Sequence, residues 1–256
     1  MSISPHAIVD SSARLGADVE IGPFCMVHAG VEIGAGSRIG AYCEIGVRSE
    51  HQRKCSVLTI GPGALIRSHS VIYGGSTYGA GLETGHRVTL REGTRCGAGV
   101  RIGTLSDIQG DCEIGDYVRM HSSVFVAKGS AIRCFAWLLP RVVLTNDPTP
   151  PSNDHVGCVV DEYAVIAAAA LLMPGVRVGT NALVAAGACV TADVPPHMVA
   201  MGVPARIVGP TSNVRLRGDS DHAAYPWTNH FHRGYPSELV HEWMSAEAGE
   251  EKNDAT

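Results

Sequence analysis

Charged residues are scarce in this sequence, and a basic excess is missing. Only 18% of the 256 residues are charged, the formal net charge is -5 and the pI is near 6.2. Proteins that hold nucleic acid by neutralising its phosphates carry the opposite sign. We therefore expect no nucleic-acid partner.

Long apolar runs are also missing. The longest, from Ala164 to Met173, has ten residues, whereas a membrane-spanning helix needs about 20. The first residues, Met1 to His6, show no basic end followed by an apolar stretch, as a secretory signal would. The sequence predicts a cytoplasmic protein with no membrane partner.

Aromatic residues and paired cysteines are the third deficit. Aromatics make up 5% of the chain, so a core built from its 45% hydrophobic residues must be largely aliphatic. The eight cysteines include no C-x-x-C pair, the spacing typical of zinc and redox sites. Disulfides are not expected in a reducing cytosol.

What the sequence has in abundance is a repeat of six residues. Aliphatic residues recur at every sixth position in three series, Val9 to Ile45, Ile60 to Leu144 and Val160 to Val190, and only Thr84 among the 28 positions is not hydrophobic. Two residues earlier stands a small residue, such as Cys25, which alternation places on the same inward face of a strand. Short strands, corners and repetition every six residues predict a coil wound as a triangular prism.

Smaller features refine this prediction. Glycine often follows the large aliphatic residue, as at Gly103, and we expect it there because it tolerates the backbone angles of a sharp corner. Cysteines at repeat positions are predicted to be buried packing residues. Two polar segments, Val47 to Leu58 and Thr145 to Gly157, interrupt the repeat and are predicted to project outward as loops. Cys55, in the first of them, is expected to be an exposed thiol.

The repeat resembles that of the hexapeptide-repeat acyltransferases, whose fold is a left-handed parallel β-helix with three hexads per coil. The resemblance implies an all-β domain over residues 1–210 with about nine coils, and a homotrimer with active sites shared between subunits. Residues 211–256 lose the repeat and are predicted to form an appendage, with a helix over Ser237 to Ala248 and a frayed end.

Two local resemblances bear on the substrate. Residues 1–46 look like the opening coils of the lipid A pathway sugar acyltransferases, but in Ser106 to Gly115 their histidine is replaced by Gly110. The segments Thr84 to Glu92 and Leu144 to Pro148 look closer to nucleotide-sugar N-acetyltransferases. The predicted activity is therefore acetyl-CoA-dependent acetylation of the amine of a nucleotide-linked amino sugar, by direct attack on the thioester.

Direct attack needs a deprotonated acceptor and correct positioning, and no metal. His86 is the first candidate for the general base, and His121 is the second, since two coils separate them along one edge. If the amine arrives neutral, Asn146 would orient it instead, together with Asp147.

Three further groups of residues are candidates for binding. Asp107 and Gln109 are predicted to contact the sugar. Ala185, Ala186 and Gly187 have little side-chain bulk, so a backbone amide there could closely approach the pantetheine arm of CoA. The G-x-P-A-R segment that ends at Arg206 resembles the closing segment of the same acyltransferases, and Arg206 is predicted to contact a CoA phosphate.

Three alternatives remain open at this point. The enzyme could be an O-acyltransferase acting on a sugar nucleotide, a small alcohol or an amino acid. A zinc carbonic anhydrase uses the same fold, but Arg91 and Val126 stand where its second histidine would follow His86 or His121. The third alternative is a non-catalytic scaffold.

Overall fold

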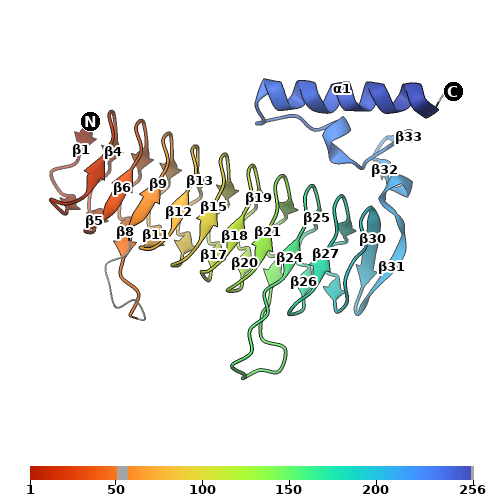
Figure 1. Ribbon diagram of the computed structural model, residues 1–256, viewed down its shortest axis with the longest axis horizontal. Coiled ribbons are helices and arrows are strands. Elements are labelled where there is room, and N and C mark those ends of the chain that lie inside the picture. Colours follow the sequence, from red (N-terminus) through yellow and green to blue (C-terminus); the bar gives the residue numbers. More distant parts are fainter. Residues whose placement is uncertain (51–56, 255–256) are drawn as a thin grey trace.

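The computed structural model, which describes residues 1–50 and 57–254, is a parallel β-helix with three flat faces (Figure 1). Strands that are neighbours in a face are 18 residues apart along the chain, as in the pairing of Leu65 with Glu83 and of Ile66 with Thr84. This spacing confirms three hexads per coil and the predicted fold class, a left-handed parallel β-helix.

Successive strands pass from face A to face B to face C. Face A comprises β1 (Ser2–Ile3), β4 (Glu20–Ile21), β7 (Arg38–Ile39), β10 (Leu65–Ile66), β13 (Glu83–Thr84), β16 (Arg101–Ile102), β19 (Arg119–Met120), β22 (Trp137–Leu138), β25 (Val165–Ile166), β28 (Leu183–Val184) and β30 (Met198–Gly202). Face B comprises β2 (Ile8–Val9), β5 (Met26–Val27), β8 (Glu44–Val47), β11 (Val71–Tyr73), β14 (Thr89–Leu90), β17 (Asp107–Ile108), β20 (Phe125–Val126), β23 (Val143–Leu144), β26 (Leu171–Leu172) and β29 (Cys189–Val190). Face C comprises β3 (Arg14–Leu15), β6 (Val31–Ile33), β9 (Leu58–Ile60), β12 (Thr77–Tyr78), β15 (Arg95–Cys96), β18 (Glu113–Ile114), β21 (Ala131–Ile132), β24 (Val159–Val160) and β27 (Arg177–Val178).

The predicted count of about nine coils is too low. Face A has eleven parallel strands, β1 to β30, and is extended by the antiparallel β31 (Ala205–Pro210). Counting hexads misses β1, which precedes the series that begins at Val9. It also misses β30, because Leu183 pairs with Val199 after only 16 residues.

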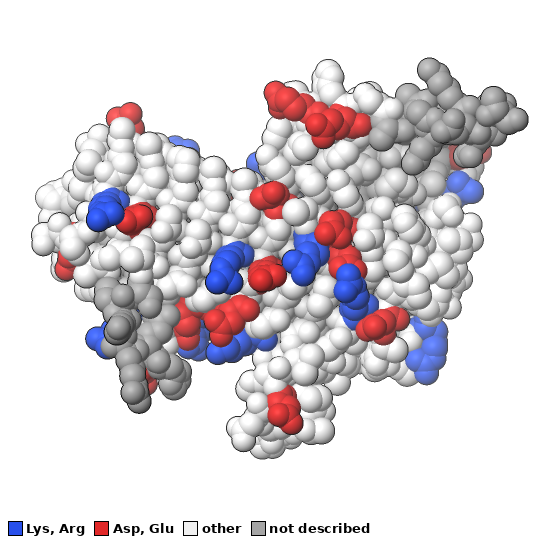
Figure 2. Space-filling view, viewed as in Figure 1, with Lys and Arg blue, Asp and Glu red and all other residues white. Residues whose placement is uncertain are grey.

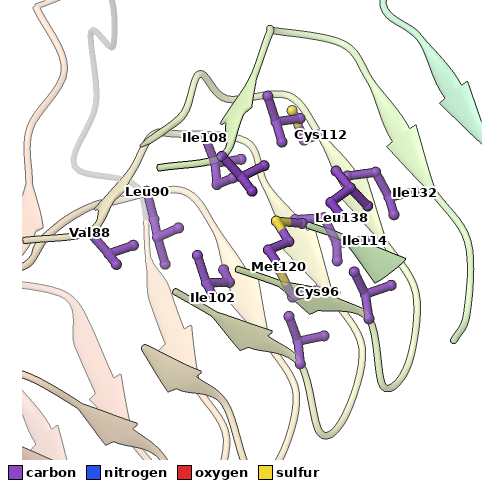
Figure 3. Packing of buried hydrophobic residues seen from close by; sticks show 14 of the residues in the cluster. Val88, Leu90, Cys96, Ile102, Ile108, Cys112, Ile114, Met120, Ile132 and Leu138 are labelled. Carbon is purple, nitrogen blue, oxygen red and sulfur yellow. The ribbon is translucent and has the colours of Figure 1, made fainter. Parts of the chain in front are cut away.

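The interior of the prism is filled by the large residues of the repeat (Figure 3). Ile108, Ile132 and Leu138 are fully buried. Cys96 and Cys112 point into the same interior, which confirms that repeat cysteines serve as small hydrophobic packing residues. Cys55 lies outside the described residues.

The glycines after the large aliphatic residues have a different role from the one predicted. A Cβ atom added to Gly103 would lie 2.5 Å from the Ser122 amide nitrogen of the next coil, and its φ is not positive. The left-handed corner angle falls instead on residues such as Leu105, with φ of 62°. Close approach of stacked coils, not corner geometry, therefore requires glycine at this position.

The second interruption projects from the β-helix as a loop between β23 and β24 (Figure 1). It adds ten residues to the usual spacing, since Ala131 pairs with Val159 across 28 residues. Of the first interruption, residues 51–56 lie outside the described part of the chain.

The appendage after β31 contains η1 (Thr211–Asn213), β32 (Arg215–Leu216), β33 (Asp219–Ala223), η2 (Trp227–Asn229) and α1 (Ser237–Asp254). The helix prediction is confirmed, and α1 continues past Ala248 to Asp254. In Figure 1 the helix lies beside the C-terminal half of the β-helix. No helix in residues 1–50 and 57–254 is both long and apolar enough to cross a membrane.

The appendage is held by a second hydrophobic cluster. Trp227 and Tyr235 are buried against Val165 of β25, with Tyr117, Phe135 and Trp243 packed around them. Phe135 and Tyr117 stack on adjacent coils with ring centroids 5.5 Å apart, which gives the appendage an aromatic platform. The aromatic residues, few as they are, are concentrated at this contact.

Candidate active site

Both histidines predicted as bases lie on the A/B corner, the row of turns that connect each face A strand to the next face B strand. His86 follows β13, and His121 follows β19 two coils later, at a separation of about 10 Å along the corner. The structure thus brings them to one edge, as the hexad spacing predicts.

The two histidine rings have different surroundings. Both residues are exposed, and the Nδ1 of His86 lies 2.8 Å from the Ser68 hydroxyl oxygen. The His121 ring lies beside Trp137, with ring centroids 5.8 Å apart, and partial burial lowers the pKa of His121. Within residues 1–50 and 57–254 the His121 ring makes no hydrogen bond. It is therefore neutral at pH 7 with a nitrogen free to accept a proton.

Each histidine borders a cavity on face A. The cavity beside His121 has a volume of about 730 Å³, and that beside His86 about 300 Å³. Both are lined by Arg101, Gly103 and Ser122, so the two cavities are neighbours, and together they are called here the face A groove.

Asn146 and Asp147 lie elsewhere, on the corner between faces B and C where the 145–157 loop leaves the β-helix. The Asn146 amide donates to the Lys128 carbonyl oxygen at 3.1 Å. The Asp147 carboxylate accepts a hydrogen bond from the Ser152 hydroxyl at 2.7 Å, and this bond is the first cause of its lowered pKa. Both side chains therefore hold the loop in its conformation.

Asp107 and Gln109 lie on face B and at its outgoing corner. The Gln109 amide donates to Asp107 Oδ2 at 2.8 Å, while Asp107 Oδ1 is buried without a hydrogen-bond partner. Burial raises the pKa of Asp107. In a single chain neither residue reaches the face A groove.

The residues predicted to bind CoA are gathered at the far end of the A/B corner. The turn 185–187 follows β28, which pairs with β30, and Met201 of β30 pairs with Arg206 of β31. Ala186 and Gly187 are exposed, and an added Cβ at Gly187 would meet nothing within 4 Å. Arg206 is exposed and donates only to the neighbouring Ala205 carbonyl oxygen, at 2.8 Å.

Hydrogen bonds within the β-helix narrow the choice of amide in this turn. The amide of Ala185 already donates to Ala200, and that of Gly187 to Ala168. Of the three amides, therefore, only that of Ala186 is available to a bound pantetheine arm.

The other residues of the larger cavity were not predicted from the sequence. Arg101 and Arg119 come from face A, while Tyr225, Phe231 and Arg233 come from the appendage. The only signal for the first pair was their spacing of 18 residues, and nothing in the hexad pattern predicts where the appendage docks.

The described residues provide no set of metal ligands. In the part of the chain that the structure describes, no group of three histidine, cysteine or carboxylate side chains is placed to hold a metal ion.

Acidic and basic side chains are intermingled on the face shown in Figure 2. Two of the ion pairs of face C are Arg133–Glu113 and Arg177–Asp161.

Comparison with known proteins supports the resemblance drawn from the repeat. Residues 12–46 match the family model of the bacterial transferase hexapeptide (six repeats). A 2,3,4,5-tetrahydropyridine-2,6-dicarboxylate N-acetyltransferase of Staphylococcus aureus (strain JH9) is 42% identical over 73 residues, which are 28% of this chain and 30% of that protein. The match thus spans under a third of the relative.

Among solved structures, the UDP-N-acetylglucosamine acyltransferase of Arabidopsis has the same fold. It superposes with a TM-score of 0.60 at 18% sequence identity, over 81% of this chain and 74% of that chain. Residues 12–46 are therefore hexapeptide repeats of the bacterial transferase type, within a β-helix of the kind that acyltransferases have.

Proposed function

We propose that the protein is a CoA-dependent acyltransferase that acetylates the amine of a nucleotide-linked amino sugar. The observation that carries the proposal is the His121 imidazole at the wall of a cavity of about 730 Å³, where its ring makes no hydrogen bond to any described residue. The matched N-acetyltransferase of S. aureus supports the reaction class.

His121, rather than His86, takes the proton in this proposal. Attack on a thioester requires the acceptor nitrogen to lose a proton as the new C–N bond forms and the C–S bond breaks, with the thiol as leaving group. A base whose pKa lies below 6.5 is unprotonated at neutral pH and ready to accept that proton. His86, with Nδ1 already beside Ser68, is left to contact the substrate.

The acyl donor extends along the A/B corner. Three coils, about 14 Å, separate His121 from Ala185, and Arg206 lies two strands further on. A CoA phosphate at Arg206 would therefore leave the extended arm running past Ala186 and Gly187 toward His121. The small residues of that turn let the arm lie close to the backbone.

A homotrimer completes the site in this proposal. Asn146, Asp147, Asp107 and Gln109 lie on face B or its outgoing corner, away from the groove of their own chain. This arrangement requires that face B of one subunit lies against the A/B corner of the next in a closed three-fold ring. The carboxylate of Asp107, which accepts from the Gln109 amide, would then lie beside substrate held in the neighbour's groove.

The test is a thiol-release assay with acetyl-CoA and a panel of nucleotide-linked amino sugars, with the parent hydroxy sugars as controls. Release of CoA thiol that requires the free amine supports the proposal. No release with any member of the panel contradicts it.

A hydroxyl acceptor is the second candidate function, and the state of His121 favours it too. A sugar hydroxyl remains protonated at neutral pH and therefore depends more strongly on a base than an amine does. Thiol release with the hydroxy sugars, and none with the amino sugars, would indicate O-acylation.

A further inference from the structure

Two arginines lie side by side at the centre of face A. Arg101 of β16 and Arg119 of β19 are directly paired in the sheet register. Like charges at directly opposite positions of neighbouring strands destabilise a sheet unless an anion joins them. Both guanidinium groups converge on Gly234 of the appendage, where an added Cβ would lie 3.2 Å from Arg101 Nη1 and 3.3 Å from Arg119 Nη2.

The Arg119 guanidinium is nearly enclosed but forms no ion pair. The residue is 6% exposed, its Nη2 donates to the Gly234 carbonyl oxygen, and its Nε is buried without a hydrogen-bond partner. Its charge lies over the Tyr235 ring, 4.6 Å from the ring centroid, and no carboxylate forms an ion pair with it among the described residues. The residue nevertheless lines the cavity, where its charge is not neutralised by an anion.

Among the described residues, Glu83 is the acid that forms an ion pair with Arg101, and none forms one with Arg119. Arg101 shares Glu83 with Arg67, at 3.1 and 2.9 Å respectively. Three arginines and no acidic residue are among the residues that line the cavity, the third arginine being Arg233. The lining of the cavity is therefore positively charged.

The other side of the cavity is aromatic. Trp137 belongs to β22 of face A, and Tyr225 and Phe231 belong to the appendage. Trp137 and Phe231 are perpendicular, with centroids 5.4 Å apart, and form a corner against which a planar ring can stack. Flat apolar walls beside paired guanidinium groups suit a ligand that combines an aromatic ring with phosphates.

We propose that this cavity binds a nucleoside diphosphate group, with its pyrophosphate on Arg101, Arg119 and Arg233 and its base between Trp137 and the appendage. Two substrates contain such a group: the acceptor, in its nucleotide, and CoA, in its adenosine diphosphate part. We assign the acceptor's, because the cavity adjoins His121 while the residues proposed for CoA lie at the far end of the corner. That assignment rests on the proposed function, whereas the binding itself does not.

The three tryptophans of the chain give a direct readout. Trp137 and Trp227 line the cavity, and Trp243 contacts Trp227 with centroids 5.5 Å apart. Intrinsic fluorescence of the full-length protein would be titrated with uridine diphosphate, inorganic pyrophosphate and CoA. We expect saturable quenching by uridine diphosphate, competition by pyrophosphate, and weaker binding at high salt.

Variants distinguish the site from the rest of the surface. Arg101→Ala should weaken binding of uridine diphosphate roughly 10- to 100-fold, as loss of charge-assisted bonds does. Arg233→Ala, an exposed position, should weaken it as well and serves if Arg101→Ala fails to fold. Arg95→Ala is the matched control, since Arg95 is exposed on face C, and it should bind like the wild type.

Absence of saturable quenching by uridine diphosphate, or unchanged affinity in both arginine variants, would overturn the proposal. Tighter binding of CoA than of uridine diphosphate, lost in Arg101→Ala, would overturn the assignment to the acceptor. If uridine diphosphate binds as expected but no nucleotide-linked sugar supports thiol release, the proposed function fails while this site stands.

Discussion

Trp227 should be the residue on which docking of the appendage depends most. Its side chain is 5% exposed, and its Nε1 donates to the Tyr163 carbonyl oxygen at 3.2 Å. Its rings lie 5.4 Å from Tyr235 and 5.5 Å from Trp243, centroid to centroid. Replacing a buried tryptophan by alanine typically costs about 3–5 kcal/mol, since packing is lost and a cavity remains.

That cost should appear locally, because Trp227 contributes to the second cluster and not to the interior of the prism. A loss of about 3–5 kcal/mol in docking free energy raises the equilibrium constant for opening by a factor of roughly 10² to 4 × 10³. We expect Trp227→Ala to speed hydrogen exchange of amides in residues 224–236 by about that factor, with exchange in β17 and β21 unchanged.

Met244→Ala is the matched control for Trp227→Ala. Met244 lies on α1 and is 55% exposed, so its truncation should leave exchange in residues 224–236 at the wild-type rate. Wild-type exchange in Trp227→Ala would show instead that other contacts hold the appendage. Faster exchange throughout the β-helix would refute the local character of the effect.

Three further predictions concern the core, the donor and the acceptor. Ile114→Asp should lower the free energy of unfolding by roughly 4 kcal/mol or more in urea titrations, because it buries a charge without a partner at a side chain that is 4% exposed; an effect equal to that of the exposed Glu113→Gln would contradict this. Arg206→Ala should raise the KM for acetyl-CoA and leave that of the acceptor unchanged, and equal changes in both would contradict a phosphate contact. Asn146→Ala should raise the acceptor KM and lower kcat together if Asn146 orients the acceptor. Wild-type kinetics with a loosened 145–157 loop would mean that Asn146 serves only to hold the loop through its hydrogen bond to Lys128.

The hexad made the β-helix predictable because its inward position admits only apolar or small residues. Ile108 and Ile132 are buried as that position requires, and so is Cys112 at the small position. The two ends of the β-helix were not predicted because their strands do not follow the six-residue period. The last turn reaches Val199 two residues early, and β1 stands before the first regular repeat.

The predicted site residues were placed unevenly, for a physical reason. Spacings that are multiples of the coil put His86 and His121 on one corner correctly. No such rule covers the appendage, where the Trp137 indole donates to the Tyr235 hydroxyl across 98 residues. The arginine and aromatic walls of the larger cavity could therefore be found only from the folded structure.

The most direct test of the account is the rate of acetyl transfer in His121→Ala and His86→Ala as a function of pH. The account predicts that His121→Ala lowers kcat by a factor of about 100 to 10,000 and that His86→Ala lowers it much less. Since burial lowers the pKa of His121, the wild-type kcat should be constant around pH 7 and fall only below pH 6.5, as the imidazole becomes protonated. A wild-type kcat in His121→Ala, or a wild-type rate that already falls above pH 6.5, would contradict His121 as the base.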